Sequence, residues 1–376
     1  MSKLQIVIEA TEAYKRERRG IGVQMRSWLE AAPYDEFRDV DFVIVRQDGG
    51  DVEQLDISAD NVQVVTEKAE TETAYIDKLY SQQPDVLFFP LAAAKYARDS
   101  PVRQVAVDYG MEDLYSRNYI APTLVADYLR DHEFALQHFD CIITVSETSK
   151  RDLAWFYPEY KDNITVVYPG VTDAPVAGSG TVATDERLRN TPYFLIIGYE
   201  HKKNIMRIAR AFQLFKERTG SPTKLAVAGK PGYGAEEIDA CINALPCRPD
   251  IIRLGYIMSA QKHQLLSQTK ALVALPVYEG FGISALEGMK AGKTTLVSDN
   301  GSLREVVGDA GYLADPFSIE SMAQQFALID GLADDPKLAF AAERVAVFDQ
   351  RLQSRKLMQT LIAVAKLPRK PPSENS

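Results

Sequence analysis

The sequence predicts an α/β protein of two domains, each built on a doubly wound parallel sheet. Short apolar runs typical of buried strands recur along the chain and alternate with segments of helical periodicity. Several of the predicted strand-to-helix turns contain glycine, as at 20–22 and 280–282, which is where such folds approach ligands with their backbone. A length of 376 residues suffices for two domains with separate cores.

The first half of the chain opens with a predicted strand, glycine turn and helix. An apolar run at 4–8 leads to the loop Arg19-Gly20-Ile21-Gly22, and helical spacing resumes from 23 to 31. A complete G-x-G-x-x-G is absent, so the dinucleotide-binding fingerprint of dehydrogenases is not met. Further strands are predicted at 42–45, 62–65, 86–89, 102–107, 141–145 and 164–168.

A shift in composition toward Thr, Ala, Gly, Ser and Pro from about 172 to 190 indicates a linker. Beyond it, strands are predicted at 193–197, 224–228, 251–254, 271–277 and 295–298, and helices at 319–332 and 339–365. The expected organisation is a first domain at 1–172, a linker at 173–190, a second domain at 191–350, a terminal helix at 351–366 and a Pro-rich, disordered tail at 367–376.

Bulk properties exclude several functional classes. A formal net charge of −9 argues against a nucleic-acid-binding protein, whose contact surface is basic. Cys141, Cys241 and Cys247 have no paired spacing, which favours reduced thiols over a disulfide framework or a zinc site. The D-x-D triplet at 39–41 lies at the amino edge of the predicted sheet, where a chance solvent-facing turn explains it better than a metal site.

The predicted location is cytoplasmic. The chain opens directly on a strand, without a secretory segment, and contains no run of about 18 apolar residues. The basic run at 14–19 is typical either of a solvated surface or of an arm over a phosphorylated acceptor or an anionic bilayer. Association with the inner face of the cell membrane therefore stays open.

The stretch 271–305 contains a predicted strand, a glycine loop, a helix from Ile283 to 291 and a second strand. The loop reads Glu279-Gly280-Phe281-Gly282 and lies at the carboxyl edge of the sheet, where open α/β folds bind ligands. Backbone N–H groups at a helix N-terminus favour a phosphate, which would leave Glu279 and Glu287 to accept hydrogen bonds from hydroxyls. That combination favours a nucleotide-sugar; the alternative is two ordinary surface glutamates.

The ordered run Glu279-Gly-Phe-Gly-x4-Glu287-Gly-Met-x-Ala-Gly, followed by Ser298 and 305–310 (Glu-Val-Val-Gly-Asp-Ala), resembles the signature of glycosyltransferase family 4. The resemblance implies the GT-B fold, with two Rossmann-like domains facing a cleft. It also implies a retaining, metal-independent enzyme that needs no cofactor beyond its nucleotide-sugar substrate. In the family pattern Glu287 binds the nucleotide ribose and Glu279 contacts the donor sugar near its reacting carbon.

The second domain contains further residues expected to bind the donor. Lys202 and Lys203 follow a predicted strand and are well placed to neutralise a diphosphate. The alternative is that they are solvent-exposed residues at the start of a helix, without a role in binding. Members of the family have Arg-Lys-Asn here, so Lys202 keeps the charge without the bidentate fork. The resemblance places Lys230 in a turn beside the nucleotide, and Tyr256 and Ile257 against the nucleobase.

In the first domain the resemblance implies that the loop with Gly20 and Gly22 faces the donor phosphates and the acceptor. The family strand that ends in His-Asp, with its His in the acceptor pocket, corresponds here to Asp108-Tyr109. Asp108 is therefore a candidate substitute hydrogen-bond acceptor or base. An aromatic loop packed on the domain explains the surrounding residues equally well.

The expected function is transfer of a hexosyl unit, mannosyl or glucosyl first, to a glycan or lipid-linked glycan in surface polysaccharide assembly. Lys203, Glu279 and Asp108 are the expected catalytic residues, with no metal involved. The alternatives are a nucleotide-sugar epimerase of the same architecture and a catalytically silent nucleotide- or glycan-binding protein. Only four histidines are present, which weighs against the epimerase because its cleft normally pairs acids with histidines.

Overall fold

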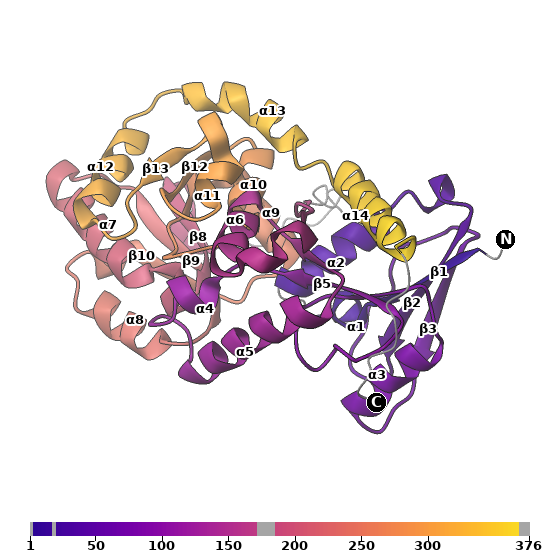
Figure 1. Ribbon diagram of the computed structural model, residues 1–376. Coiled ribbons are helices and arrows are strands. Elements are labelled where there is room, and N and C mark those ends of the chain that lie inside the picture. The colour runs from indigo at the N-terminus through magenta and orange to yellow at the C-terminus, as the bar shows by residue number, and fades with distance from the viewer. Residues whose placement is uncertain (1–2, 17–19, 171–184, 368–376) are drawn as a thin grey trace. The chain divides into compact units, whose positions relative to one another are not determined.

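The computed structural model describes residues 3–16, 20–170 and 185–367, and the chain forms two compact units (Figure 1). The first unit comprises residues 1–110, 126–172 and 348–376, and the second comprises 111–125 and 173–347. Each unit contains one β-sheet whose strands pair in parallel, so the predicted α/β class is confirmed.

The sheet of the first unit has the strand order β3-β2-β1-β4-β5-β6-β7. Its strands are β1 (Leu4–Glu9), β2 (Val40–Gln47), β3 (Val62–Glu67), β4 (Val86–Phe89), β5 (Arg103–Asp108), β6 (Cys141–Thr144) and β7 (Ile164–Val166). The helices along this part of the chain are α1 (Thr11–Tyr14), α2 (Gly20–Glu30), α3 (Glu72–Ser81), α4 (Glu112–Tyr115), α5 (Pro122–His138) and α6 (Glu147–Phe156). Every strand predicted for this half of the chain is present.

The sheet of the second unit has the order β10-β9-β8-β11-β12-β13. Its strands are β8 (Tyr193–Tyr199), β9 (Lys224–Pro231), β10 (Ile251–Gly255), β11 (Ala271–Ala274), β12 (Thr294–Ser298) and β13 (Tyr312–Ala314). The helices are α7 (Ile205–Thr219), α8 (Ala235–Asn243), α9 (Ser259–Gln268), α10 (Ile283–Lys290), α11 (Leu303–Val307), α12 (Ile319–Asp330) and α13 (Ala341–Ala346), and α14 (Gln350–Ala365) follows in the first unit. The prediction missed β13, because its apolar run lies between Gly311 and Asp315 and is only three residues long. The equally short β7 belongs to a longer apolar run that continues through Val167 and Tyr168.

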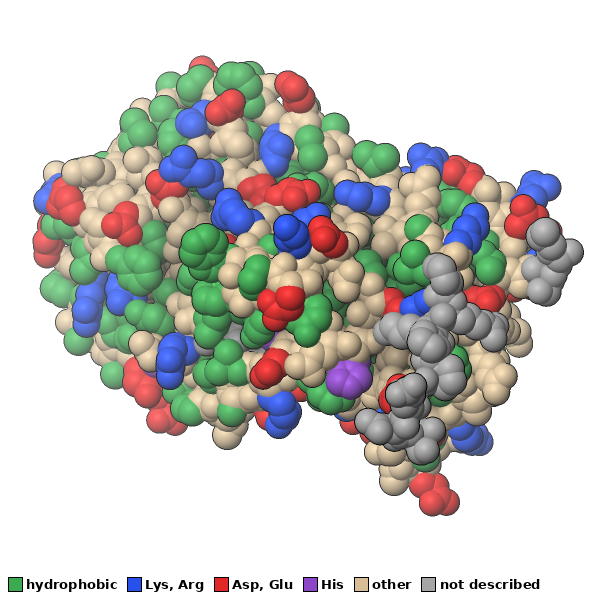
Figure 2. Space-filling view, viewed as in Figure 1, with side chains coloured by type: hydrophobic (Ala, Val, Ile, Leu, Met, Phe, Trp, Pro, Cys, Tyr) green, Lys and Arg blue, Asp and Glu red, His purple; other side chains and the backbone are tan. Residues whose placement is uncertain are grey.

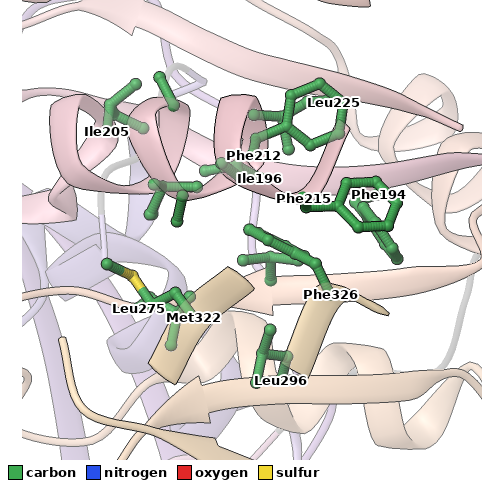
Figure 3. Packing of buried hydrophobic residues seen from close by; sticks show 14 of the residues in the cluster. Phe194, Ile196, Ile205, Phe212, Phe215, Leu225, Leu275, Leu296, Met322 and Phe326 are labelled. Atoms are coloured by element: carbon green, nitrogen blue, oxygen red, sulfur yellow. The ribbon is translucent and has the colours of Figure 1, made fainter. Parts of the chain in front are cut away.

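The core of the second unit forms where α7 and α12 pack on one face of the sheet (Figure 3). The apolar stripe of α7 buries Phe212 and Phe215 completely, and they meet Phe194 of β8 and Phe326 of α12. The ring centroids of Phe194 and Phe326 are 5.0 Å apart. Aromatic rings at such distances add to the free energy gained from burying their area, so this cluster fixes α7 against the sheet.

Glycine sets the distance between α10 and the sheet. A Cβ atom at Gly288 would lie 2.8 Å from Cδ2 of Leu272 in β11 and 2.9 Å from Oγ1 of Thr295 in β12. Real Cβ atoms do not approach so closely, and neither neighbour is at the end of a long flexible chain. Helix α10 therefore lies closer to β11 and β12 than any side chain at position 288 would allow.

Two local predictions are wrong. Gly20 and Gly22 form the first turn of α2 and not a loop, so that helix begins before residue 23. The helix predicted at 339–365 is broken: a 3-10 turn (Pro336–Phe340) and α13 precede α14, which starts after Asp349. The side chain of Asp349 accepts the backbone N–H of Leu352 at 2.8 Å and caps α14, which stops the two helices from merging.

The domain boundaries also differ from the expected ones. Residues 111–125, expected in the first domain, belong to the second unit. Of the expected linker, 173–184 lies outside the described residues, whereas Glu186–Leu188 forms a 3-10 turn and Leu188 is buried in a core cluster of the second unit. The predicted tail lies outside the described residues from 368 onward.

Helix α14 packs on α2 and β1 inside the first unit. The amide of Gln350 donates to the carbonyl of Ser27 at 2.7 Å, and a Cβ atom at Gly170 would lie 2.8 Å from Cα of Gln350. Beside this contact the indole of Trp28 donates to the carbonyl of Tyr168 at 3.0 Å. The last helix of the chain, α14, therefore packs in the same unit as the first strand, β1.

We expect Gly288→Ala to destabilise the protein by about 1–3 kcal/mol, because the added methyl group forces α10 away from β11 and β12. Urea denaturation measures the change. Gly331→Ala is the matched control, since the nearest atom to its Cβ would lie at 3.5 Å and its φ of −81° suits alanine. Equal midpoints for Gly288→Ala and the unmodified chain would contradict the close packing of α10.

Candidate functional site

The candidate site lies where the sheet of the second unit changes its direction of growth. From β8 the chain adds β9 and β10 on one side, and β11, β12 and β13 on the other. The loops that leave the carboxyl ends of β8 and β11 diverge at this switch point, which is where open α/β sheets bind ligands. The backbone N–H of Val277 donates to the carbonyl of Lys202 at 3.0 Å and joins the two loops.

Lys203 ends a 3-10 turn (His201–Lys203) between β8 and α7. Its aliphatic chain crosses Gly198, where a Cβ atom would lie 2.9 Å from Cγ of Lys203 and where φ is 112°. Gly198 is therefore required twice, for its backbone conformation and for the space that Lys203 occupies. The next residue, Asn204, is buried and donates from its amide to the carbonyl of Pro316 at 2.7 Å, which fixes the start of α7.

Each lysine of the turn is paired with a carboxylate. The ammonium of Lys203 donates to Oε1 of Glu279. Nζ of Lys202 lies 3.0 Å from Oε1 of Glu112 and 3.8 Å from Oε1 of Glu200. The Lys203, Glu279, Lys202 and Glu112 side chains are only 20–25% exposed, so bulk water screens these pairs weakly.

The pairing determines the charge of the groups. Burial alone would raise the pKa of Glu279, but the charges of Lys203 and Lys202 and the hydrogen bond from Lys203 outweigh it and lower that pKa. Burial would lower the pKa of Lys202, yet the charges of Glu112, Glu279 and Glu200 raise it. Glu279 is thus ionised and Lys202 cationic at neutral pH.

The loop that contains Glu279 is held by side chains from the last residue of β12 and from the segment that follows it. The hydroxyl of Ser298 donates to the carbonyl of Pro276 at 2.6 Å, and the hydroxyl of Ser302 donates to the carbonyl of Glu279 at 2.8 Å. Gly282 has a φ of 97°, and a Cβ atom there would lie 2.3 Å from Cδ2 of Leu303. A small cavity between these loops is lined by Lys203, Glu279, Gly282, Ser284 and Leu303 together with residues of β8 and β11.

The backbone of Gly280 to Ile283 leads into α10, as predicted, while the ring of Phe281 is buried. Glu287 on that helix is bound by Lys262 of α9, with 2.5 Å between Nζ and Oε1. Glu279 and Glu287 each hold a lysine in this structure, so hydroxyls of a ligand would have to share these carboxylates with an ammonium group. Sequence reasoning missed Lys262, which carries no local signal.

Lys230 and Tyr256 come together at the ends of β9 and β10. Nζ of Lys230 lies 4.7 Å above the ring centroid of Tyr256, which is 54% exposed. Ile257 instead packs against a core cluster of the second unit. Because β10, β9, β8 and β11 are neighbours in that order, Tyr256, Lys230, the two lysines and Glu279 follow one another along a single edge of the sheet.

Residues 111–125, which we call the strap, bring three side chains to this unit that sequence reasoning did not select. Besides the pair between Glu112 and Lys202, the ring of Tyr115 stacks on Tyr278, with 4.7 Å between centroids and 13° between planes. Arg207 of α7 donates to the hydroxyl of Tyr119 at 3.0 Å. The predicted aromatic loop after Asp108 is thus packed, but on the second unit.

Asp108 lies in the first unit and is almost fully buried at the end of β5. Its Oδ2 is 2.8 Å from Nε2 of His132 on α5, and its Oδ1 accepts the backbone N–H of Gly110 at 2.7 Å. Burial would raise the pKa of Asp108, but the charge of His132 and both hydrogen bonds lower it. An ionised carboxylate with both oxygens engaged is a poor base, so its expected part in proton transfer would have to pass through His132.

The remaining predicted residues lie elsewhere. Gly20 and Gly22 are in α2 of the first unit, so the described structure does not group them with the lysines of the second unit. Within the described ranges no three His, Cys, Asp or Glu side chains are grouped so as to hold a metal ion. Figure 2 shows acidic and basic side chains interspersed on the face in view.

The charge pairing at Glu279 has a pH signature. Because its pKa is lowered, its ion pair stabilises the fold above the ordinary pKa of about 4.5 and is lost as the pH falls through the lowered value. We expect Glu279→Gln to cost about 1.5–3 kcal/mol at pH 7, and the cost to shrink below about pH 4.5. Urea denaturation of both chains at pH 7 and pH 4 measures it; a difference independent of pH would contradict the pairing.

Residues 186–339 match the sequence profile described as glycosyl transferases group 1, and residues 71–174 match that of glycosyltransferase family 4. O-antigen chain mannosyltransferase B of Escherichia coli is 28% identical over 218 residues, which cover 57% of this chain and 56% of that protein. Alpha-1,3/1,6-mannosyltransferase ALG2 of Dictyostelium discoideum is 32% identical over 158 residues, 37% of each. The chain thus spans about half the length, or less, of these curated relatives.

Solved structures share the whole architecture at low identity. A glycosyltransferase from Rickettsia africae ESF-5 superposes with a TM-score of 0.67 and 13% identity over 98% of this chain and all of its own. Sucrose-phosphate synthase from Thermosynechococcus elongatus gives 0.71 and 16% over 96% of this chain and all of its own. Likeness at these identities shows the fold alone, but the profile matches cover both halves of the chain, and the 279–310 signature lies at the switch point. The chain belongs to glycosyltransferase family 4 and has the GT-B fold.

Proposed function

We propose that the protein is a retaining glycosyltransferase that moves a mannosyl unit, or another hexosyl unit, from a nucleotide diphosphate sugar to a glycan or lipid-linked glycan. The observation that carries the proposal is the pair of lysines at the switch point of the second unit, beside the start of α10. The names of the relatives, which include mannosyltransferases of O-antigen assembly, support mannose and therefore GDP-mannose as donor.

The main catalytic contribution is stabilisation of the leaving diphosphate. As the bond to the sugar breaks, negative charge grows on the phosphate oxygens, and Lys203, Lys202 and the amides of 280–283 are placed to meet it. These groups act in a partly buried site, where their charges are worth more than in water. No metal ion is required for this step.

The order of side chains along the sheet edge supports one orientation of the donor. Tyr256 and Lys230 lie at the end expected for the nucleobase, Lys202 and Lys203 follow, and Glu279 lies at the end expected for the sugar. Glu287, held by Lys262, would bind the ribose hydroxyls. Glu279 would orient the sugar once the diphosphate has taken over Lys203.

We further propose that the acceptor is bound at the first unit and that Asp108 acts as a positioning residue for His132. A carboxylate only accepts hydrogen bonds, so its bond to Nε2 keeps a proton on that nitrogen; in the neutral form of His132 the lone pair is then on Nδ1. Nδ1 is buried in this structure, so an acceptor hydroxyl would reach it only after a local movement. Gly20 and Gly22, at the start of α2, remain candidates for the same region.

Action at the inner face of the cell membrane is the proposed location, because the related mannosyltransferases are named for O-antigen chains. In the described part of the chain, no helix combines the length and apolar character needed to cross a bilayer. The basic run expected to contact lipid or acceptor lies partly outside the described residues. Of its described cations, Lys15 pairs with Glu12 and Arg16 with Asp51.

We expect Lys203→Ala to lower mannosyl transfer about 100- to 1,000-fold, because one leaving-group contact is lost. The unfolding temperature should fall as well, because Glu279 loses the cation that it is paired with. The assay is GDP release from GDP-mannose with methyl α-mannoside as acceptor probe. The matched control is Lys270→Ala: Lys270 pairs with Asp330 at 3.1 Å with similar exposure, but at the amino edge of the same sheet. Equal losses in the two variants would contradict the assignment.

A thermal-shift panel of GDP, UDP and ADP tests the nucleotide independently of the acceptor. A ligand that binds only the folded state stabilises it by about 2.7 kcal/mol at a hundredfold excess over Kd, so the preferred base stands out. An epimerase would convert the donor without any acceptor, and a silent binding protein would bind nucleotide without releasing product. Product analysis with donor alone and with donor plus acceptor separates the three activities.

For the Asp108–His132 pair we expect Asp108→Asn to reduce acceptor-dependent transfer while GDP still raises the unfolding temperature, since the nucleotide is bound by the other unit. His132→Gln should behave alike. The matched control is His138→Gln, on the same helix, where the ring stacks on Phe134 and its Nδ1 bonds to that residue's carbonyl. Unchanged transfer in both the Asp108 and the His132 variants would refute the proposed role.

A further inference from the structure

More carboxylates than ammonium groups lie around Lys202 and Lys203 when no donor is bound. Three carboxylates, those of Glu112, Glu200 and Glu279, lie around the two ammonium groups of Lys202 and Lys203. If the proposed function is correct, a diphosphate brings further negative charge to the same two ammonium groups. Like charges in a partly buried site repel strongly, so at least one carboxylate has to give way when the donor binds.

Glu112 is the carboxylate that gives way most easily. Burial and the charge of Glu279 raise its pKa despite the opposing charge of Lys202, whereas the pKa of Glu279 is lowered. Ionised Glu112 is therefore the less favourably placed of the two anions. The backbone around the two residues also differs. Glu279 belongs to a loop whose carbonyls accept hydrogen bonds from Ser298 and Ser302, whereas Glu112 belongs to the strap.

We propose that Glu112 is a built-in competitor of the donor diphosphate: it holds Lys202 in the empty enzyme, and nucleotide binding displaces it and loosens the strap from the second unit. This inference rests on the proposed function. It assigns to Glu112 a role in setting donor affinity, and it makes the strap an element whose docking reports whether the nucleotide is present.

The contacts of the strap fit such a reversible element. Besides the buried residues Met111, Ser116 and Ile120, the strap makes an ion pair, a ring stack and a hydrogen bond through Glu112, Tyr115 and Tyr119. The guanidinium of Arg207 also lies 5.6 Å above the ring of Tyr119. Each of these contacts involves a side chain that is partly exposed, and contacts of this kind are individually weak. Loss of the Glu112 pair therefore weakens the contact of α4, the part of the strap that carries Glu112 and Tyr115, with the second unit.

Both ends of the strap are anchored in the first unit. Gly110, immediately before it, has a φ of 104° and donates its N–H to Asp108. His132, on the part of α5 that follows it, is bound by the same carboxylate. Asp108 thus contacts both the residue before the strap and the helix that continues from it.

The test measures GDP affinity by isothermal titration for the full chain and for Glu112→Gln. Glutamine keeps the shape of the side chain but removes the negative charge, so we expect GDP to bind about 2- to 10-fold more tightly, as for removal of one partly exposed ion pair. The matched control is Asp330→Asn, which breaks the Lys270 pair at the opposite sheet edge and should leave GDP affinity unchanged.

Two further measurements cover a variant that does not fold. Tyr115→Ala weakens the strap from its exposed side without touching either lysine, and we expect it to tighten GDP binding as well. In the unmodified chain, GDP should increase amide hydrogen exchange within 111–125.

The outcomes separate the two proposals. No GDP, UDP or ADP binding by the unmodified chain would overturn the proposed function and the inference with it. GDP binding that is equal in the unmodified chain, Glu112→Gln and Tyr115→Ala would overturn the inference alone, as would increased protection of 111–125 on binding GDP.

Discussion

The ion pair between Lys203 and Glu279 is the interaction on which the candidate site depends. It joins the loop after β8 to the loop after β11. These two strands are neighbours in the sheet, and the strands that follow them in the chain lie on opposite sides of the pair. Without Glu279, the ammonium group of Lys203 would be partly buried without a negatively charged partner in the enzyme that has no ligand bound. Burying an unpaired charge is unfavourable. The Glu279 carboxylate neutralises this charge. An anionic ligand that binds Lys203 therefore has to compete with Glu279.

The surroundings follow from the same constraint. Gly198 leaves space for the lysine chain, Asn204 fixes the start of α7, and Ser302 holds the backbone of Glu279. Each of these residues acts on the position of a charged group and not on a substrate. An arrangement in which neutral hydrogen bonds fix the loops, and charges are paired only with one another, is ready to exchange a carboxylate for a phosphate.

The two units contribute unequally to what the structure shows. The second unit contains a charged site whose parts are linked by direct contacts, and the family signature lies within it. The first unit contributes the buried Asp108–His132 pair at the end of β5 and the anchor points of the strap. Solved structures share this architecture at 13–16% identity.

The amino-acid sequence alone determined the features that are local in the chain. Apolar runs of strand length gave twelve of the strands, and the order of residues from Glu279 to Ala310 predicted the family. Local patterns failed where a feature was too short, as with β13, or where a single cap decided it, as Asp349 does at α14.

Only the tertiary structure decided which charges meet. Lys202 and Glu112 are 90 residues apart, and Lys262 and Glu287 are 25 apart, on elements that become neighbours through the packing of helices on a sheet. Periodicity shows which face of a helix is buried, but it contains no information about which opposite charge lies across that face. The residues of the candidate site could therefore be predicted from the sequence. Their ion pairs, which involve both predicted catalytic carboxylates, Glu279 and Asp108, could be seen only in the folded structure.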